Sequence, residues 1–129
     1  MNWIEQEQLF AVTANTTDQT KERVNHRWSG IRLYVQVTAV SGTGGLRCLL
    51  QGKIPGFSPA TYFNLNEDPP LLTATGIWCF DWYPGALSGR TSANIVQSCS
   101  IKVPYVFQIL WQNTDATAYD YKTWIDYLI

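Results

Sequence analysis

The chain has 129 residues, a length typical of one domain, and a formal net charge of −1 from 9 Lys and Arg against 10 Asp and Glu. This balance argues against a nucleic-acid partner, and no apolar run reaches the roughly 18 residues of a membrane span. Charged residues make up only 15% of the chain, whereas aromatic residues make up 14% and include six Trp. Since interface cores are rich in Tyr and Trp and poor in charge, we expect a partner to cover part of the surface. The alternative is a Trp-rich core.

The first 27 residues are predicted to form an arm or extension. Residues 1–7 are acidic and polar, and they lack the basic start and apolar stretch of a secretory signal peptide. Gln8–Ala14 has the composition of a short strand, whereas Asn15–Glu22 is polar and turn-like. We therefore expect residues 28–129 to form the folded domain.

The clearest strand is Ile31–Val40. Apolar residues alternate there with more polar ones, which predicts that one face of the strand is buried. Leu46–Ile54 alternates in the same way, and a glycine-rich segment at residues 41–45 separates the two runs. Glycine permits the positive φ angles that tight turns need. The two runs therefore predict a β-hairpin.

Four further strands are predicted, at Ala60–Leu65, Thr73–Tyr83, Ser100–Gln112 and Tyr119–Ile129. Residues 86–98 are expected to be mainly a loop. Thr73–Tyr83 carries apolar or aromatic side chains on both faces, which predicts one face on the core and one against another layer or a partner. Short strands between turns, with no segment of helical period, predict an all-β fold: a single antiparallel β-sandwich, jelly-roll-like, with the N-terminal arm.

Few residues could carry catalysis. His26 is the only histidine, and we expect a solvated side chain there rather than the base of a minimal hydrolase. No pair among Cys48, Cys79 and Cys99 has the Cys-x-x-Cys spacing of a zinc or redox site, so reduced thiols are expected, with Cys48 and Cys79 in the core. The carboxylates that a glycosidase pair or calcium site would need are expected to be surface charges: Glu67, Asp68, Asp115, Asp120 and Asp126. We therefore expect a protein that is not an enzyme and has no catalytic residues, metal or cofactor.

The aromatic residues are the unusual part of the composition. Trp78, Trp82 and Tyr83 gather near one strand end. Exposed, they would suit stacking on sugar rings, as in carbohydrate-binding modules, or act as hot spots of a protein interface. Buried, they would be ordinary core packing. The residues alone leave these three alternatives open.

A set of short motifs resembles small virion proteins of tailed bacteriophages. Residues 31–53 read IRLYVQVTAVSGTGGLRCLLQGK, with the family's order of Val-Thr-Ala-Val-Ser-Gly-Thr before a second strand that ends near Gln-Gly-Lys. Ala74-Thr75-Gly76 then leads into an aromatic strand that ends in Pro84-Gly85. Pro104–Trp111 and Tyr119–Ile129 fit the family's last hairpin and apolar C-terminus. The resemblance covers roughly residues 28–129.

The resemblance implies a β-sandwich protein of the phage head or tail, most often a capsid decoration (cement) protein. Its expected partners are the major capsid protein and further copies of itself, as a homotrimer, on the outer surface of the virion capsid; no nucleic acid and no membrane are expected. Contacts are expected from the arm at Trp3–Phe10 and from the loops at residues 57–70 and 86–98. The candidate interface residues are Trp3, Phe10, Phe57, Tyr62, Trp78, Trp82 and Tyr83. The alternative is a tail, baseplate or fibre component with a glycan-binding sandwich.

Overall fold

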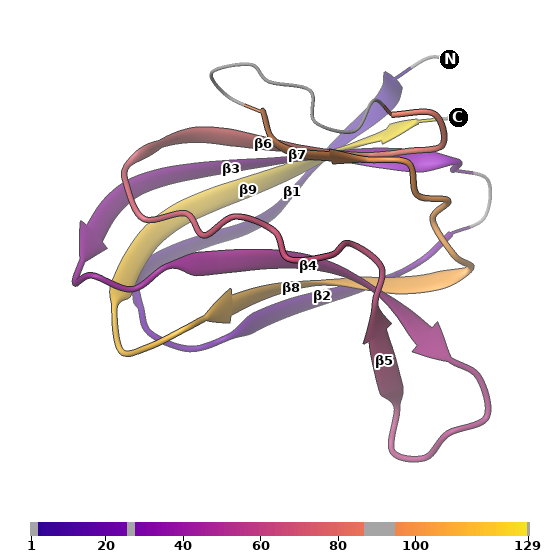
Figure 1. Cartoon of the computed structure of the whole chain (residues 1–129), viewed down its shortest axis with the longest axis horizontal. Helices are drawn as coiled ribbons and strands as arrows, with labels where there is room; N and C mark the ends of the chain where they lie inside the picture. Colours follow the sequence, from indigo (N-terminus) through magenta and orange to yellow (C-terminus); the bar gives the residue numbers. More distant parts are fainter. Residues whose placement is uncertain (1–2, 26–27, 87–94, 129) are drawn as a thin grey trace.

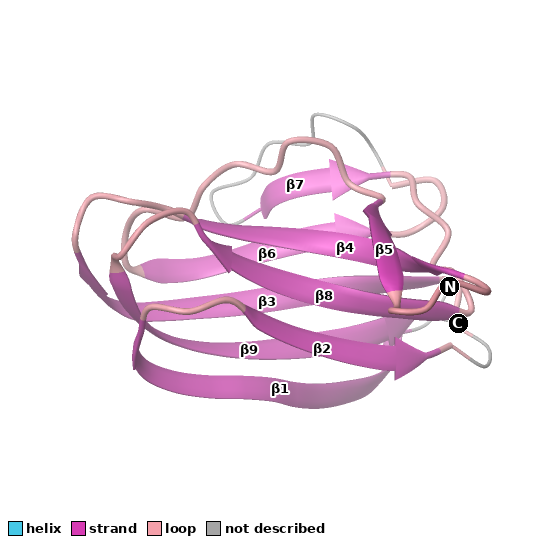
Figure 2. Ribbon diagram, turned by 90° about the horizontal axis from the view of Figure 1, so that it is seen from below, coloured by secondary structure: helices cyan, strands magenta, loops and turns pink. Residues whose placement is uncertain are grey.

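The computed structural model describes residues 3–25, 28–86 and 95–128, with the backbone alone at residues 3–6. Within these ranges the chain forms nine strands and no helix. The strands are β1 (Trp3–Asn15), β2 (Gln19–Val24), β3 (Gly30–Ser41), β4 (Leu46–Ile54), β5 (Thr61–Asn64), β6 (Gly76–Trp82), β7 (Ile95–Cys99), β8 (Val106–Asn113) and β9 (Ala118–Leu128). They build two stacked sheets (Figures 1 and 2). The predicted all-β sandwich is confirmed.

The strand order is that of a jelly roll. One sheet has the order β1-β9-β3-β6-β7 and the other β2-β8-β4-β5. Without β7, the chain winds eight strands between two four-stranded sheets, as in the double Greek key of jelly rolls. The pairings are antiparallel apart from β6 with β7, which run parallel. Residues 95–99, expected to lie in a loop, therefore form an edge strand.

The predicted hairpin of β3 and β4 is wrong. The two strands lie in different sheets, with β3 between β9 and β6, and β4 between β8 and β5. Alternation of apolar and polar residues determines which face of a strand is buried, but it does not determine which strand lies beside it in the sheet. Here both apolar faces point into the same core from opposite sides, as fully buried Leu33 and Leu50 illustrate. The glycine-rich segment turns the chain across the sandwich, with Gly42 at a φ of +135°.

The first residues also differ from the expected arm. β1 pairs with β9 and β2 pairs with β8, so residues 3–24 supply one edge strand to each sheet. Arg23 Nε lies 3.1 Å from Glu7 Oε1 and joins the two edges. Lys21 lies over the ring of Phe10, 5.2 Å from its centroid. Charged side chains of this kind protect sheet edges from unwanted pairing, which explains why so polar a segment belongs to the fold.

The core lies between the sheets and is dominated by aromatic residues. The largest fully buried side chains include Trp82, Trp111, Tyr119, Tyr121, Phe80 and Phe107. Trp28 stacks on Tyr127 with ring centroids 3.6 Å apart. Cys48 and Cys79 are buried free thiols, as expected. Two of the Trp residues, Trp82 and Trp111, therefore fill the core, whereas Trp28, Trp78 and Trp124 are half-buried.

Candidate interaction surface

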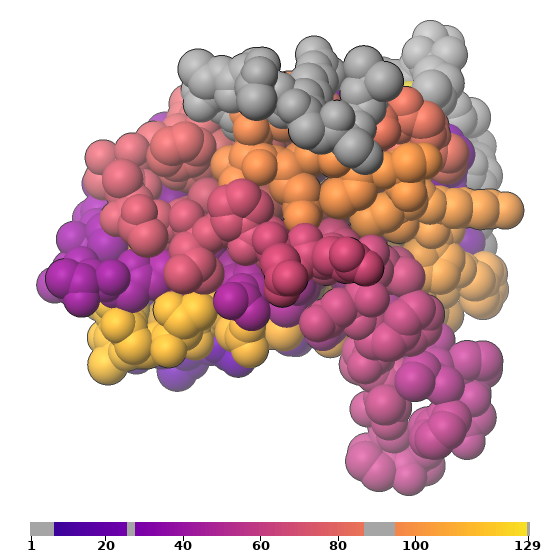
Figure 3. Space-filling model, in the orientation of Figure 1, coloured from indigo at the N-terminus to yellow at the C-terminus, as the bar shows by residue number. Residues whose placement is uncertain are grey.

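The β4–β5 hairpin projects beyond the sandwich; we call residues 51–64 the finger (Figures 1 and 3). Its strands pair from Gln51 opposite Asn64 to Ile54 opposite Thr61, and every residue of its tip, 55–60, is exposed. Phe57 at the tip is 61% exposed. A large apolar side chain is therefore presented at the end of a hydrogen-bonded hairpin.

Polar contacts support the finger from the four-stranded sheet. Tyr62 donates a hydrogen bond from its hydroxyl to the carboxylate of Glu22 on β2, and this bond raises the pKa of Tyr62 to about 12. Gln108 Nε2 donates to Gln51 Oε1 at 2.6 Å, and Gln51 Nε2 donates to Asn64 Oδ1 at 2.8 Å. These bonds fix the direction of the finger relative to the sandwich.

A second apolar surface lies at the base of the finger; we call it the basal patch, and it consists of Val24, Lys53, Pro55, Pro104, Tyr105 and Val106. All of these except Val24 line a hollow of about 170 Å³. Val24 pairs directly with Val106 and therefore extends the same face. Tyr105 is 68% exposed and Val24 40%. Exposed apolar surface gathered in one place is typical of an interaction site.

A third apolar surface lies along the edge of the sandwich; we call it the edge groove, and it is lined by residues 70–74 with Trp78, Ile95 and Val96. Its volume is about 280 Å³. Trp78 Nε1 donates to the carbonyl of Ala74 at 3.4 Å, which orients the indole along the groove. Leu71 on its rim is 42% exposed.

The neighbouring stretch of the same edge is closed by Gln97 of β7. Its amide oxygen accepts hydrogen bonds from Trp82 Nε1 at 3.2 Å and Asn66 Nδ2 at 2.8 Å. Its Nε2 donates to the carbonyl of Glu67 at 2.7 Å. The sandwich is therefore sealed by polar bonds beside Gln97 and hollow beside Trp78.

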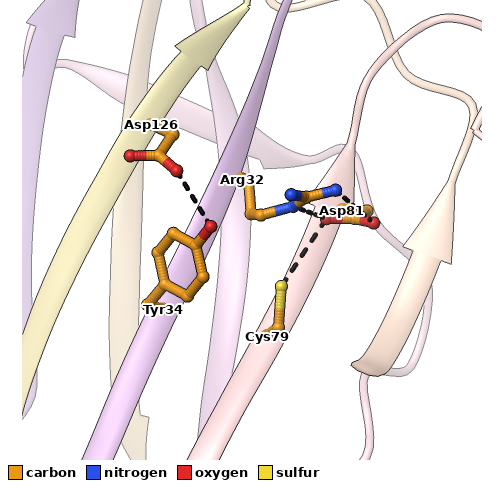
Figure 4. A network of polar contacts seen from close by, with 5 residues as sticks. All are labelled: Arg32, Tyr34, Cys79, Asp81 and Asp126. Atoms are coloured by element: carbon orange, nitrogen blue, oxygen red, sulfur yellow. Dashed lines mark hydrogen bonds and ion pairs between the residues drawn. The ribbon is translucent and has the colours of Figure 1, made fainter. Parts of the chain in front are cut away.

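A polar network occupies the outer face of the five-stranded sheet (Figure 4). Arg32 contacts both carboxylate oxygens of Asp81, at 2.6 and 3.3 Å, and Tyr34 donates to Asp126 Oδ2 at 2.9 Å. The bond to Asp81 raises the pKa of Arg32 despite the opposing effect of burial, and burial raises the pKa of Tyr34 with help from Asp126. Cys79 Sγ lies 3.6 Å from Asp81 Oδ1. The network links side chains of β9, β3 and β6, and within it the positive charge of Arg32 is paired with the negative charge of Asp81.

The structure separates the predicted interface residues. Phe57 is exposed at the finger tip, and Tyr62 supports the finger. Trp78 is half-buried and lines the edge groove. These three residues lie on the surfaces described above.

The other predicted interface residues lie elsewhere. Trp82 is fully buried, so its assignment to an interface is wrong, and Trp78 and Trp82 do not form the exposed row that glycan stacking requires. Phe10 is half-buried and packs edge-on against Trp111, with ring centroids 4.9 Å apart. Tyr83 is half-buried beyond the end of β6, and Trp3 begins β1 with its backbone opposite Leu128.

Within the described residues, five large exposed apolar residues were not among the predicted interface residues: Val24, Phe63, Leu71, Ile77 and Tyr105. The sequence does indicate that Val24 is exposed, because the outward-facing positions before it on β2 hold the polar residues Thr20 and Glu22. No sequence pattern marks Tyr105 as part of a surface patch, because only the fold brings it beside Pro55 of the finger.

The described part of the chain brings no side chains together in an arrangement that suits catalysis or metal binding. His26 and residues 87–94 of the predicted contact loop lie outside that part. No cluster of three or more His, Cys, Asp or Glu residues that could hold a metal ion occurs within it. Nor does it contain a helix that could cross a membrane. In comparisons with known proteins, no family model, no curated protein and no solved structure matches the chain.

Proposed function

We propose that this protein is a non-enzymatic capsid decoration protein of a tailed bacteriophage, which binds the lattice of the major capsid protein and stabilises the expanded head. The observation that carries the proposal is the basal patch. It places exposed Tyr105 at a hollow in the surface of the jelly roll, with exposed Val24 beside it. Tyr is enriched at the centres of protein interfaces, because it buries a large area with few rotatable bonds.

The fold and the resemblance support the same reading. Jelly rolls recur in viral capsid proteins, although a fold alone hosts many functions. The segments that resemble phage virion proteins coincide with the framework of this jelly roll. Residues 31–53 span β3, the crossing turn and most of β4, and residues 74–85 contain β6. The resemblance therefore concerns how the sandwich is built, while the basal patch supplies a surface for binding.

The physics of a capsid lattice suits a small patch of this kind. One such contact is weak, but copies repeated over a symmetric lattice bind with a high effective concentration when they are joined to one another. A protein that binds only the expanded form of the lattice stabilises that form by mass action. Stabilisation of the head then follows from binding alone and needs no chemical step.

Co-sedimentation with capsids tests the proposal. Purified protein is mixed with expanded capsids that lack it and, in parallel, with unexpanded procapsids. We expect saturable binding to the expanded shells alone, with a plateau that gives the copies per capsid subunit. The double variant Val24→Ser/Tyr105→Ser should lose this binding.

Ile77→Ser is the matched control, because Ile77 is 52% exposed on β6, away from the basal patch. It removes exposed apolar surface without touching the patch and should bind like the wild type. Equal binding by all three proteins would show that the basal patch is not the contact. Absence of binding to either shell would contradict the decoration role and favour the tail or fibre alternative.

A further inference from the structure

We propose that the finger tip of one copy inserts into the edge groove of a second copy, so that copies join head to tail. This inference goes beyond capsid decoration, since it concerns the isolated protein in solution. It rests on two features of the same chain: Phe57, 61% exposed at the tip, and a groove of about 280 Å³ at the sandwich edge. Each leaves apolar surface in water that the other would cover.

The two features match in size and chemistry. An apolar cavity of about 150 Å³ is large enough to bind benzene, so the edge groove has room for the Phe57 ring and part of a neighbouring proline. The groove offers Leu71 and Trp78 as contacts, and none of the described residues in its lining is charged. The tip, residues 55–60, is equally free of charge. Inserting the tip therefore buries no ionic group.

The charges beside the two features are complementary. Lys53 is the single charged residue of the finger. Glu67 and Asp68, both exposed, immediately precede the groove segment 70–74. A finger that enters the groove brings a positive charge towards a pair of negative ones. This complementarity favours a second copy of the same chain as the occupant.

The fold prevents a copy from filling its own groove, because the finger points away from the body of the sandwich that carries the groove (Figures 1 and 3). The contact joins two different surfaces, so each copy keeps one finger and one groove to offer. Such heterologous contacts build a closed ring when the rotation between copies closes, and a filament when it does not. We expect a closed ring.

Sedimentation velocity of the full chain provides the first test. Wild-type protein should sediment as a multiple of the 14.6 kDa chain, in equilibrium with monomer on dilution. Phe57→Ser and Ala74→Arg, which remove the tip contact and fill the groove, should each be monomeric with unchanged circular dichroism. Ile77→Ser should associate like the wild type. A monomeric wild type at millimolar concentration, or association of Phe57→Ser equal to that of the wild type, would overturn the proposal.

Mixing the two monomeric variants separates a finger-in-groove contact from one that joins two fingers or two grooves. Phe57→Ser retains a working groove and Ala74→Arg retains a working finger, so together they can form one contact and no more. We expect a 1:1 heterodimer that grows no further. Two variants that stay monomeric when mixed would contradict the finger-in-groove arrangement.

A charge exchange tests the orientation of the contact. Lys53→Glu should weaken association roughly two- to fivefold, the range for one exposed ion pair, and adding Glu67→Lys with Asp68→Lys should restore it. Failure of the exchange to rescue would exclude the proposed placement of Lys53. Capsid binding is scored with Val24→Ser/Tyr105→Ser and self-association with Phe57→Ser and Ala74→Arg, neither of which changes a residue of the basal patch, so either proposal can fail while the other stands.

Discussion

Arg32 and Asp81 stand directly opposite each other on β3 and β6, with Arg32 Nε 2.6 Å from Asp81 Oδ1. The Asp81 side chain has no exposed surface, whereas 25% of the Arg32 side chain is exposed. The pair lies on the outer face of its sheet, where a charged residue ordinarily faces water. A buried carboxylate at this position depends on its guanidinium partner.

We therefore expect Arg32→Met to destabilise the fold by about 3 kcal/mol, because it leaves a buried negative charge without this partner. Tyr34→Phe is the comparison, since it removes the hydroxyl that bonds Asp126 and contacts Arg32 but keeps the Arg32–Asp81 pair, and it should lower the free energy of unfolding by about 1 kcal/mol. Urea unfolding of both variants measures the difference. Equal effects of the two substitutions would show that the Arg32–Asp81 pair is dispensable.

Asn66 provides a second prediction, because this buried amide bonds the backbone of β4 on the side where β5 no longer pairs with it. Leu50 N donates to Asn66 Oδ1 at 2.7 Å, and Asn66 Nδ2 donates to the carbonyl of Cys48 at 3.1 Å. Each buried group left unpaired costs about 1–3 kcal/mol, so Asn66→Ala should lower the free energy of unfolding by at least about 2 kcal/mol.

Asn64→Ala is the matched control for Asn66→Ala, since Asn64 is an exposed amide on the neighbouring strand β5. It should change stability by less than about 0.5 kcal/mol. Chemical denaturation of both variants gives the comparison. An Asn66→Ala variant as stable as Asn64→Ala would mean that β4 finds other partners for its backbone.

Glu7 makes the stability of the fold depend on pH. Burial alone would raise the pKa of Glu7, but hydrogen bonds from Arg23 and Tyr127 and the charge of Arg23 outweigh burial and lower it. A lowered folded-state pKa adds stability above the unfolded-state value of about 4.3, and this contribution is lost as the pH falls through the folded-state pKa. Glu7→Gln should therefore be less stable than the wild type at pH 7.

The difference between Glu7→Gln and the wild type should shrink as the pH falls below about 4, because the wild-type carboxyl then also becomes neutral. Thermal melts between pH 2.5 and 7 measure this difference. Two stability curves that stay parallel over the whole range would assign no acid sensitivity to Glu7.

The thiols give a prediction that needs no variant. Burial raises the pKa of Cys48, and thiolates rather than thiols react with alkylating agents. Cys48 and Cys79 are buried, whereas Cys99 is half-buried. In the native protein Cys99 should react first, and Cys48 should react only at the rate of unfolding. Mass spectrometry of iodoacetamide-treated protein follows the three sites, and fast labelling of Cys48 under native conditions would contradict its place in the core.

Local sequence patterns were sufficient to predict most strands but not their neighbours. The alternation of β3 predicted its buried face, as fully buried Leu33 and Val35 show. The same patterns misplaced β4 beside β3, because period-two alternation is equally consistent with a hairpin and with a crossing between sheets. β7 was missed because its five residues, IVQSC, depend on parallel pairing with β6 rather than on alternation.

The candidate surfaces were predicted only in part, for a related reason. Phe57 could be predicted as an exposed contact residue because its sequence neighbours are Pro, Gly and Ser, which cannot bury it locally. Trp82 could not be told from a surface residue, since both faces of its strand are aromatic or apolar and only the facing sheet decides which is covered. The basal patch joins β2, the finger and the segment before β8, and no window of sequence contains all three.

The pairing of β1 with β9 has a consequence for how the chain folds. In the described fold β1 has β9 as its only partner, more than 100 residues further along the chain, and β2 likewise waits for β8. Neither sheet can be completed until β8 and β9 are available, so the sandwich closes through contacts of long sequence separation that form slowly. The charged side chains of β1 and β2 and the bulges of β1 then protect the incomplete fold as well as the finished edge, because they keep the waiting strands from pairing with those of other chains.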